Sequence, residues 1–332
     1  MCSVMDLKQI EYIVKIAETA NITRASEQLF ITQSALNQQL LKLENELGVK
    51  LFERHKNHLT PTDAGKVYLK YGRQILQEKR EAYNIIGDLA HFNTGHFSFT
   101  FSRERGLDLF VATYFEFHKK FPHITVEPQE MSVHNQQQKI VQGYVDLGLV
   151  TLSDDQKIPG LTYNHIRSEP LLICLPRSYV DSLPSITAAS TNAYVEELPY
   201  LDIREVKDFP FVLISKGTTL RTNVDRILSK AKLNPYILFE SFSIRALLRI
   251  VEGGIACTIT SAGYYKKGIK DIAFFRIPGD PTWEVCTVYK KNTYISKAMI
   301  FYQQLIRDYY KKNNFISSKP AATSTQYPEG NS

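Results

Sequence analysis

The segment Ile22–Leu40, ITRASEQLFITQSALNQQL, constrains the fold more than any other part of the chain. Its first half places Ile22, Ala25 and Leu29 on one apolar stripe at helical spacing, which predicts a short helix. Thr32 is a suitable N-cap for a second helix, because its hydroxyl can accept a hydrogen bond from a free backbone N–H. Two short helices joined by a tight turn predict a helix-turn-helix, the motif that places its second helix in the DNA major groove.

The second helix of this motif has one apolar and one polar face. The apolar face is formed by three leucines at helical spacing, Leu36, Leu40 and Leu43. The polar face carries Gln33, Ser34, Asn37 and Gln38. Asn and Gln can pair bidentately with adenine, and Ser can bond to base edges or to phosphate. For an isolated amphipathic helix a solvated polar face is the more common explanation, so the DNA interpretation depends on the segments that follow.

The residues after the second helix predict a wing. Gly48 is placed to end that helix as a C-cap glycine, and the apolar residues of segment 49–52 can pack back on the helices. The basic segment 54–58, RHKNH, then predicts a short hairpin able to touch phosphates. Thr60 and Thr62 are placed to cap a further helix.

Together these segments resemble the N-terminal domain of LysR-type transcriptional regulators, whose pattern runs TRAAExLxxSQPAxSxxIxxLExxLGxxLFxRxxxxxxLTxAG. The resemblance is contiguous over residues 5–92. Two residues of the second helix depart from the pattern: Ser34 stands at the usual proline position and Asn37 at the usual serine position. Both lie on the polar face, so we expect them to affect sequence preference more than fold. We predict DNA contacts from Arg24, Thr32, Gln33, Ser34, Asn37, Gln38, Arg54, Lys56 and Thr60.

Net charge does not carry this prediction. Residues 1–60 hold seven Lys and Arg against seven Asp and Glu, so the formal net charge of +6 lies mostly elsewhere in the chain. A basic balance alone is weak evidence for nucleic-acid binding. The placement of Arg24, Arg54 and Lys56 is therefore the better indication.

Composition indicates a cytoplasmic protein. No apolar run approaches the roughly 18 residues of a membrane span, and the first residues, MCSVMD, do not resemble a signal peptide. Met5 is a candidate native start, because the helical pattern begins at Leu7. The scattered cysteines Cys2, Cys174, Cys257 and Cys286 lack CxxC spacing, which indicates a reducing compartment and no disulfide framework.

From Asp63 to about Leu89 the apolar residues recur at helical spacing, which predicts one long helix of about 26 residues spanning about 40 Å. It carries more apolar surface than one small domain can cover. A buried core helix is one explanation. The resemblance implies another, a linker helix that pairs antiparallel with its twin in a dimer, and we prefer it because a dimer presents two recognition helices to a two-fold operator. Residues 91–95, HFNTG, then break the pattern and mark a hinge.

Beyond this hinge, strand and helix patterns alternate. Segments 97–101, 124–128 and 145–150 have strand character, and helical patterns over 107–121 and 136–142 separate them. This order predicts a parallel sheet with helices on both faces. Further strands are predicted at 171–175, 211–215, 237–240 and 257–259, and further helices at 219–231 and 243–251.

The resemblance continues through this region to about residue 312. Segments 121–126 and 142–150 resemble the family patterns YPxVxV and xGxLDxGLV. Segment 251–256 resembles VxxGxG, but Ala256 takes the place of the final glycine. The resemblance implies two lobes similar to periplasmic binding proteins, with a ligand cleft between them and crossing strands near residues 150–165 and 265–285.

Three loops converge on this cleft in the family, and helix N-termini at the carboxyl ends of strands are common ligand sites. Here the loops are segments 102–106, 132–135 and 215–219. The first is unusually charged, and Arg103 or Arg105 could clamp a carboxylate or phosphate, which predicts an anionic metabolite as effector. The alternative is that these arginines are solvated or paired with Glu104. The predicted effector residues are Ser102, Arg103, Arg105, Ser132, His134, Thr151, Ser215, Thr218 and Thr219.

The predicted fold class is α/β with an N-terminal all-α winged helix-turn-helix. The domains are a DNA-binding domain over 1–62, a dimerisation helix over 63–92, a two-lobed periplasmic-binding-protein-like effector domain over 93–312, and a disordered tail over 313–332.

The predicted function is sequence-specific transcriptional regulation, modulated by a small-molecule effector. The resemblance implies double-stranded DNA, a homodimer or homotetramer, and RNA polymerase as partners, and no membrane. No GxSxG motif, Walker loop or metal-ligand spacing is present, so we expect neither an enzyme nor a cofactor or metal. Two alternatives are a cysteine-based redox sensor, although Cys257 falls in an apolar strand, and a solute-binding module without a regulatory DNA role.

Overall fold

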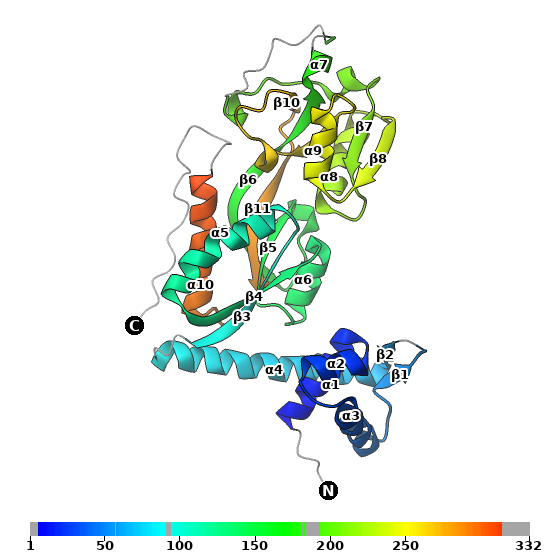
Figure 1. The fold of residues 1–332 in the computed structure, drawn as a ribbon, viewed down its shortest axis with the longest axis vertical. Helices are drawn as coiled ribbons and strands as arrows, with labels where there is room; N and C mark the ends of the chain where they lie inside the picture. The colour runs from blue at the N-terminus through cyan, green and yellow to red at the C-terminus, as the bar shows by residue number, and fades with distance from the viewer. Residues whose placement is uncertain (1–5, 57, 91–93, 181, 184–192, 314–332) are drawn as a thin grey trace.

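A computed structural model describes residues 6–56, 58–90, 94–180, 182–183 and 193–313 of the chain. The N-terminal domain and a long helix lie at one end, and two α/β lobes are stacked above them (Figure 1). The predicted tail from residue 314 onward, hinge residues 91–93, and the start with Cys2 and Met5 lie outside the described residues.

The N-terminal domain is a three-helix cluster with a two-stranded wing. Its elements are α1 (Leu7–Thr19), α2 (Ile22–Gln28), α3 (Gln33–Leu47), β1 (Phe52–Arg54) and β2 (Leu59–Pro61). The strands β1 and β2 pair antiparallel. The predicted apolar stripes form the core, where Ala25, Leu36 and Leu40 are at most 1 % exposed. The helix-turn-helix and the wing predicted from the sequence are therefore both present.

Helix α4 (Asp63–Ala90) confirms the predicted long helix, and its 28 residues span about 42 Å. Its N-terminal part packs on α1, where Leu69 joins the core of the N-terminal domain. Another side of the helix is apolar but exposed. Val67, Tyr71, Ile86 and Leu89 are each more than half exposed.

Lobe I is built from β3 (Thr94–Phe101), α5 (Arg105–Lys120), β4 (His123–Glu130), α6 (Val133–Val141), β5 (Leu147–Leu152) and α10 (Lys297–Lys312). Strand β3 pairs parallel with both β4 and β5, as the predicted βαβαβ order requires. An aromatic core lies where α5 and α10 pack together. Phe99, Phe117 and Tyr302 are fully buried there and meet edge to face.

Two long strands pass through both lobes. These are β6 (Leu161–Pro176) and β11 (Thr282–Lys290), which pair antiparallel over most of their length. They join one seven-stranded sheet of order β10-β6-β11-β5-β3-β4, with β9 also paired to β6. The sheet is therefore mixed, because the parallel strands of lobe I continue into antiparallel strands. The strand predicted at 171–175 is only the end of β6, whose first half is mostly polar and half-buried.

Lobe II contains β7 (Phe211–Ile214), α8 (Thr219–Lys230), β8 (Ile237–Ser241), α9 (Ile244–Glu252), β9 (Thr258–Ser261), β10 (Ile272–Arg276) and the short helix α7 (Arg177–Val180). Short 3-10 helices occupy Asp154–Gln156, Val195–Glu197, Ile203–Val206 and Ala262–Tyr264. The parallel strands β7 and β8 form a separate small sheet. Because β6 leaves lobe I and β11 returns to it, lobe II is an insertion within the sequence of lobe I.

Candidate DNA-binding surface and inter-lobe cleft

Helix α3 begins and ends where the sequence predicts. The Thr32 hydroxyl accepts a hydrogen bond from the backbone N–H of Ala35 at 3.2 Å. Gly48 closes the helix in the left-handed conformation, with φ of 69°, which favours glycine. The buried leucines fix the rotation of the helix, so the polar face that was predicted to contact DNA points away from the core.

A buried carboxylate holds the wing to the base of α3. Glu44 is only 5 % exposed and accepts hydrogen bonds from the backbone N–H groups of Leu51 at 2.8 Å and Phe52 at 3.2 Å. Lys50 pairs with the same carboxylate at 3.0 Å. This contact holds the start of β1 next to α3, and it was not predicted from the sequence.

The wing also reaches the polar face of α3. The Arg54 guanidinium donates to the Asn37 Oδ1 at 2.6 Å. An Asn that pairs bidentately with adenine uses the same oxygen as acceptor. Adenine recognition by Asn37 would therefore share or displace the Arg54 contact, which links the helix to the wing at one side chain.

Most of the predicted DNA-contacting side chains are available to a partner. Seven are exposed: Arg24, Thr32, Gln33, Ser34, Gln38, Arg54 and Lys56. Asn37 and Thr60 are half-buried, and Thr60 is within hydrogen-bond distance of the His55 ring at 2.9 Å. Phe30, which is not among the predicted DNA contacts, is 94 % exposed in the turn before α3 and has a left-handed φ of 54°.

The predicted effector residues lie where strands of both lobes end. Ser102 follows β3, and Ser132 caps α6. Ser215 follows β7, and Thr218 caps α8 by accepting from the Arg221 N–H at 3.1 Å. None of the nine predicted side chains lines either of the two large pockets of about 680 and 830 Å³ found at other places in the described chain.

The lobes bond directly to each other across this region. The Thr219 hydroxyl donates to the Thr151 carbonyl at 2.8 Å, and the Gln156 amide donates to the Thr219 carbonyl at 3.2 Å. Ser153 and Asn223 meet at 2.8 Å. The predicted residues Thr151 and Thr219 thus lie together, joined by the bond from the Thr219 hydroxyl to the Thr151 carbonyl.

Arg105 differs from the expectation of a free anion clamp. Its guanidinium forms two hydrogen bonds with the fully buried Glu169 of β6, at 2.8 and 2.6 Å. Arg167 binds the same carboxylate at 2.9 and 2.6 Å, and the Trp283 indole donates to it at 3.2 Å. Burial alone would raise the pKa of Glu169, but the two guanidinium charges outweigh it and hold the pKa well below its usual range. The ion-pair partner of Arg105 is therefore Glu169, not Glu104.

Glu104 itself bridges the lobes. Its carboxylate accepts hydrogen bonds from Ser243 and from the Tyr264 hydroxyl of lobe II. The residue has a left-handed φ of 62°, a strained conformation for glutamate that packing must maintain. Of the other predicted polar residues, Arg103 pairs with Glu130 at 3.1 Å and is 79 % exposed, and His134 is exposed.

Gln136 is a functional candidate that sequence analysis missed. It is fully buried beside Ser102, to whose hydroxyl its amide donates at 3.2 Å. Its Oε1 has no hydrogen-bond partner among the described residues. A buried amide oxygen without a donor is unfavourable, so this side chain can accept a hydrogen bond from a molecule bound next to Ser102.

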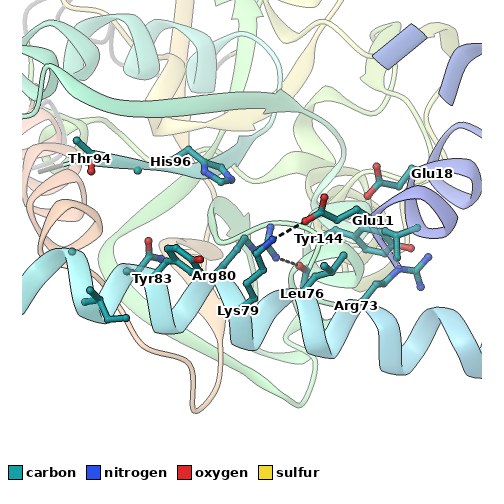
Figure 2. A pocket seen from close by; sticks show the side chains of 16 residues that line it. Glu11, Glu18, Arg73, Leu76, Lys79, Arg80, Tyr83, Thr94, His96 and Tyr144 are labelled. Carbon is teal, nitrogen blue, oxygen red and sulfur yellow. Dashed lines mark hydrogen bonds and ion pairs between the residues drawn. The ribbon is translucent and has the colours of Figure 1, made fainter. Parts of the chain in front are cut away.

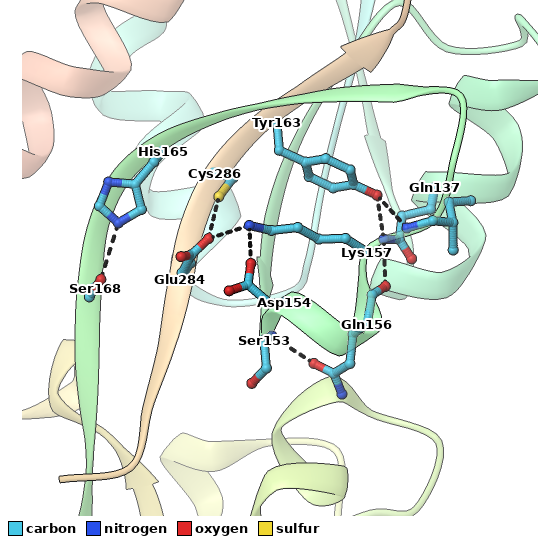
Figure 3. A network of polar contacts seen from close by, with 11 residues as sticks. Gln137, Ser153, Asp154, Gln156, Lys157, Tyr163, His165, Ser168, Glu284 and Cys286 are labelled. Carbon is cyan, nitrogen blue, oxygen red and sulfur yellow. Dashed lines mark hydrogen bonds and ion pairs between the residues drawn. The ribbon is translucent and has the colours of Figure 1, made fainter. Parts of the chain in front are cut away.

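A second polar network lies where the crossing strands pass between the lobes (Figure 3). Lys157 contacts Asp154 and Glu284, each at 2.6 Å. Burial lowers the pKa of Lys157, but these hydrogen bonds outweigh it and raise the pKa. The Tyr163 hydroxyl accepts from Gln137 at 2.8 Å and from the Ile158 N–H at 3.0 Å. The network fastens the 3-10 helix after β5 to both crossing strands.

The cysteines that the structure describes are all buried. Burial raises the pKa of Cys257 to about 12 and, together with the Glu284 charge, that of Cys286 to about 12. Thiolates are therefore scarce, which argues against redox sensing by these residues. Within the described ranges, no cluster of three or more His, Cys, Asp or Glu could hold a metal ion. No helix in these ranges is long and apolar enough to cross a membrane.

A winged helix-turn-helix joined by one helix to a two-lobed α/β domain defines the class of ligand-responsive transcriptional regulators. The chain matches the family model of the bacterial regulatory helix-turn-helix protein, lysR family, over residues 7–66. It matches the LysR substrate binding domain over residues 92–310. The chain belongs to the LysR family, as the sequence motifs indicated, and is a DNA-binding transcriptional regulator with an effector-binding domain.

The relatives agree with this assignment. The uncharacterised helix-turn-helix regulator YcgK of Bacillus subtilis is 25 % identical over 93 % of this chain and 96 % of its own length. AlsR, a transcriptional regulator of Bacillus subtilis, is 25 % identical over 81 % of this chain and 85 % of its own length. These relatives are regulators rather than enzymes, as expected.

Solved structures share the fold. A full-length OxyR from Pseudomonas aeruginosa has a TM-score of 0.64 at 19 % identity and covers 92 % of this chain and 97 % of its own. CbnR in complex with its target DNA has a TM-score of 0.56 at 20 % identity, with 92 % and 99 % covered.

Proposed function

We propose that a small-molecule effector binds between the lobes and controls how the chain engages promoter DNA. The main support is the set of direct inter-lobe hydrogen bonds at the predicted effector positions. Thr151, Thr219 and Glu104 hold the lobes together through groups that a ligand would compete for. A ligand that replaces these bonds changes the relative stability of two lobe arrangements, which is the requirement for allosteric control.

The ligand side of the cleft is proposed to include Ser102, the exposed Arg103, Gln136 and the capping residues Ser132 and Thr218. Gln136 supplies an unpartnered acceptor, and the capped ends of α6 and α8 favour negative charge. A small anionic metabolite that also carries a hydrogen-bond donor fits this set. Arg105 is not part of the proposed clamp, because Glu169 already neutralises it.

The DNA-contacting residues are proposed to be the exposed side chains of α3 and the wing. Gln33, Ser34 and Gln38 are exposed on α3, and Arg54 and Lys56 are exposed on the wing. The exposed apolar side of α4 supports dimerisation through this helix, because each copy covers the other's apolar surface. Two recognition helices then meet two half-sites, and RNA polymerase is the further partner at such a promoter.

Calorimetric screening of organic acids tests the effector proposal. A cognate acid should bind the wild-type chain. Arg103→Ala and Gln136→Leu should each weaken the affinity for that acid, because each removes a proposed ligand contact. Lys119→Gln, on the exposed surface of α5, is the matched control for charge. Equal affinity in all four proteins would place the ligand outside this cleft.

Footprinting on the DNA flanking the protein's own gene tests the DNA-binding residues. We expect Gln33→Ala combined with Gln38→Ala to abolish sequence-specific protection while leaving the thermal stability unchanged, since both side chains are exposed. Intact, specific protection by the double variant would refute the assignment of these residues.

A further inference from the structure

A pocket separate from the inter-lobe cleft lies where the N-terminal domain, α4 and lobe I meet (Figure 2). Helix α4 forms its floor, α1 one wall, and the start of β3 with the Gly143–Tyr144 turn another. Its volume is about 680 Å³, within the usual range of small-molecule sites. The family's effector cleft lies at the other end of lobe I, so the proposed function gives this pocket no role.

Positive charge exceeds negative charge around the pocket. On the acidic side, Glu11 is paired with Lys79 at 2.9 Å and Glu18 with Lys15 at 2.7 Å. No carboxylate in the described residues forms an ion pair with Arg73 or Arg80, the two other cations of the pocket. Only the charge of Glu18, which acts on Arg73 without forming an ion pair with it, offsets these two arginines in part.

The two arginines are held in place by weaker partners. The Arg80 guanidinium donates to the Gly143 carbonyl at 2.7 Å, and the Arg73 guanidinium lies 4.0 Å from the centroid of the Tyr144 ring. The Nε atoms of both side chains are enclosed and have no hydrogen-bond partner in the described part of the chain. Burial lowers the pKa of Arg73 by more than the nearby Glu18 charge raises it, as expected for a guanidinium partly removed from water. Such a cation is strongly stabilised by an anion.

The remainder of the pocket is largely apolar. Val14, Leu76, Tyr83 and Tyr144 line it together with the aliphatic stems of the basic residues. A ligand that fits therefore needs an apolar body as well as negative charge. We propose that this pocket binds a small carboxylate with an apolar body, whose anionic group accepts hydrogen bonds from the terminal nitrogens of Arg73 and Arg80.

Such a ligand would contact three parts of the chain at once. Val14 belongs to the core of the N-terminal domain, Leu76 to α4, and Tyr144 to lobe I. Binding would hold lobe I against the DNA-binding domain, and this effect would not involve the inter-lobe cleft. A site here would give the regulator a second input that acts next to its DNA-binding end.

Titration calorimetry of the full chain with octanoate tests the proposal, with octanamide as the uncharged probe of equal length. We expect octanoate to bind roughly tenfold more tightly than octanamide, because only the carboxylate forms charge-assisted hydrogen bonds. Arg73→Gln should weaken octanoate by roughly tenfold for the same reason. Lys70→Gln, an exposed cation on the same helix outside the pocket, should leave the affinity unchanged.

A steric series provides a test that keeps every charge. Gly87 lines the pocket, and a Cβ there would come no closer than 3.9 Å to the Thr94 carbonyl. Gly87→Ala should therefore fold and bind octanoate, whereas Gly87→Leu should fold and lose binding because its side chain fills the pocket. Full octanoate binding by Gly87→Leu would overturn the proposal. So would a result in which Thr219→Val at the inter-lobe cleft loses octanoate binding while the pocket variants keep it.

Sedimentation velocity on the same variants tests the competing occupant. Tyr83 and Ile86 at the rim are exposed, and the helix of a second copy could cover them. If Gly87→Leu changes the oligomeric state while octanoate binding persists, the pocket belongs to the dimer interface and the proposal is wrong. An unchanged oligomeric state with octanoate binding lost supports it.

Discussion

Replacing Glu169 by glutamine should destabilise the effector domain strongly. Glu169 is fully buried and is the only carboxylate that the described structure pairs with Arg105 and Arg167. Glu169→Gln keeps the size of the side chain but leaves two largely buried cations without a counter-charge. Breaking a buried ion pair in this way costs about 3–5 kcal/mol. For a domain of this size, that corresponds to a fall in Tm of roughly 6–20 °C.

The protein carries its own reporter for this measurement. Trp283 is the single tryptophan of the chain, and its indole donates to Glu169 at 3.2 Å. Urea unfolding followed by tryptophan fluorescence therefore monitors the altered site directly. Glu116→Gln, which removes an exposed carboxylate paired with Lys119 on α5, is the control and should unfold like the wild type.

The pH dependence gives the same prediction a second test. The pKa of Glu169 is depressed in the folded protein, so its contribution is complete above the unfolded carboxyl pKa of about 4.3 and is lost as the pH falls further. The stability gap between wild type and Glu169→Gln should be constant from pH 7 to about pH 5 and should shrink below about pH 4. A gap under about 1 kcal/mol at pH 7 would refute the reasoning, as would one independent of pH.

Three further outcomes follow from other contacts. Asn37→Ser frees the wing arginine and should relax the preference for one base, by about 1–3 kcal/mol, in a binding-site selection experiment; an unchanged preferred sequence would contradict this. Glu44→Ala leaves two buried N–H groups unpaired and should cost the N-terminal domain at least about 2 kcal/mol in denaturant unfolding, whereas a smaller loss would mean that water replaces the carboxylate. In a Cys2→Ser background, Cys257 and Cys286 should resist a thiol reagent at pH 8 until the chain unfolds, because their pKa values are raised to about 12; rapid labelling of the native protein would disprove this.

Local signals in the sequence predicted the DNA-binding end well. The Thr32 cap, the Gly48 terminator and the long apolar period of α4 each lie within a few residues of the structure they determine. Helix formation and capping are short-range effects, so a linear pattern contains them. The parallel strands of lobe I were predicted for a similar reason, because short buried strands alternate there with helices.

Contacts between distant residues were not predictable in the same way. Nothing near Arg105 in the sequence marks Glu169 as its partner, since the two are 64 residues apart and meet only in the folded domain. The full length of β6 was not predicted, because its first half is mostly polar and half-buried and lacks the apolar pattern of a core strand. No sequence pattern marked Gln136 as a candidate ligand contact, since a buried amide is recognisable only once its surroundings are known.

The insertion of lobe II within lobe I has a consequence for how the protein is made. On the ribosome, β3, β4 and β5 emerge long before β11, the antiparallel neighbour of β5, and before α10, which covers their core. Lobe II is a continuous segment and can fold as soon as it has been synthesised. We therefore expect lobe I, although it begins first, to be completed last. Truncation within α10 should leave an assembled lobe II beside an open, aggregation-prone lobe I.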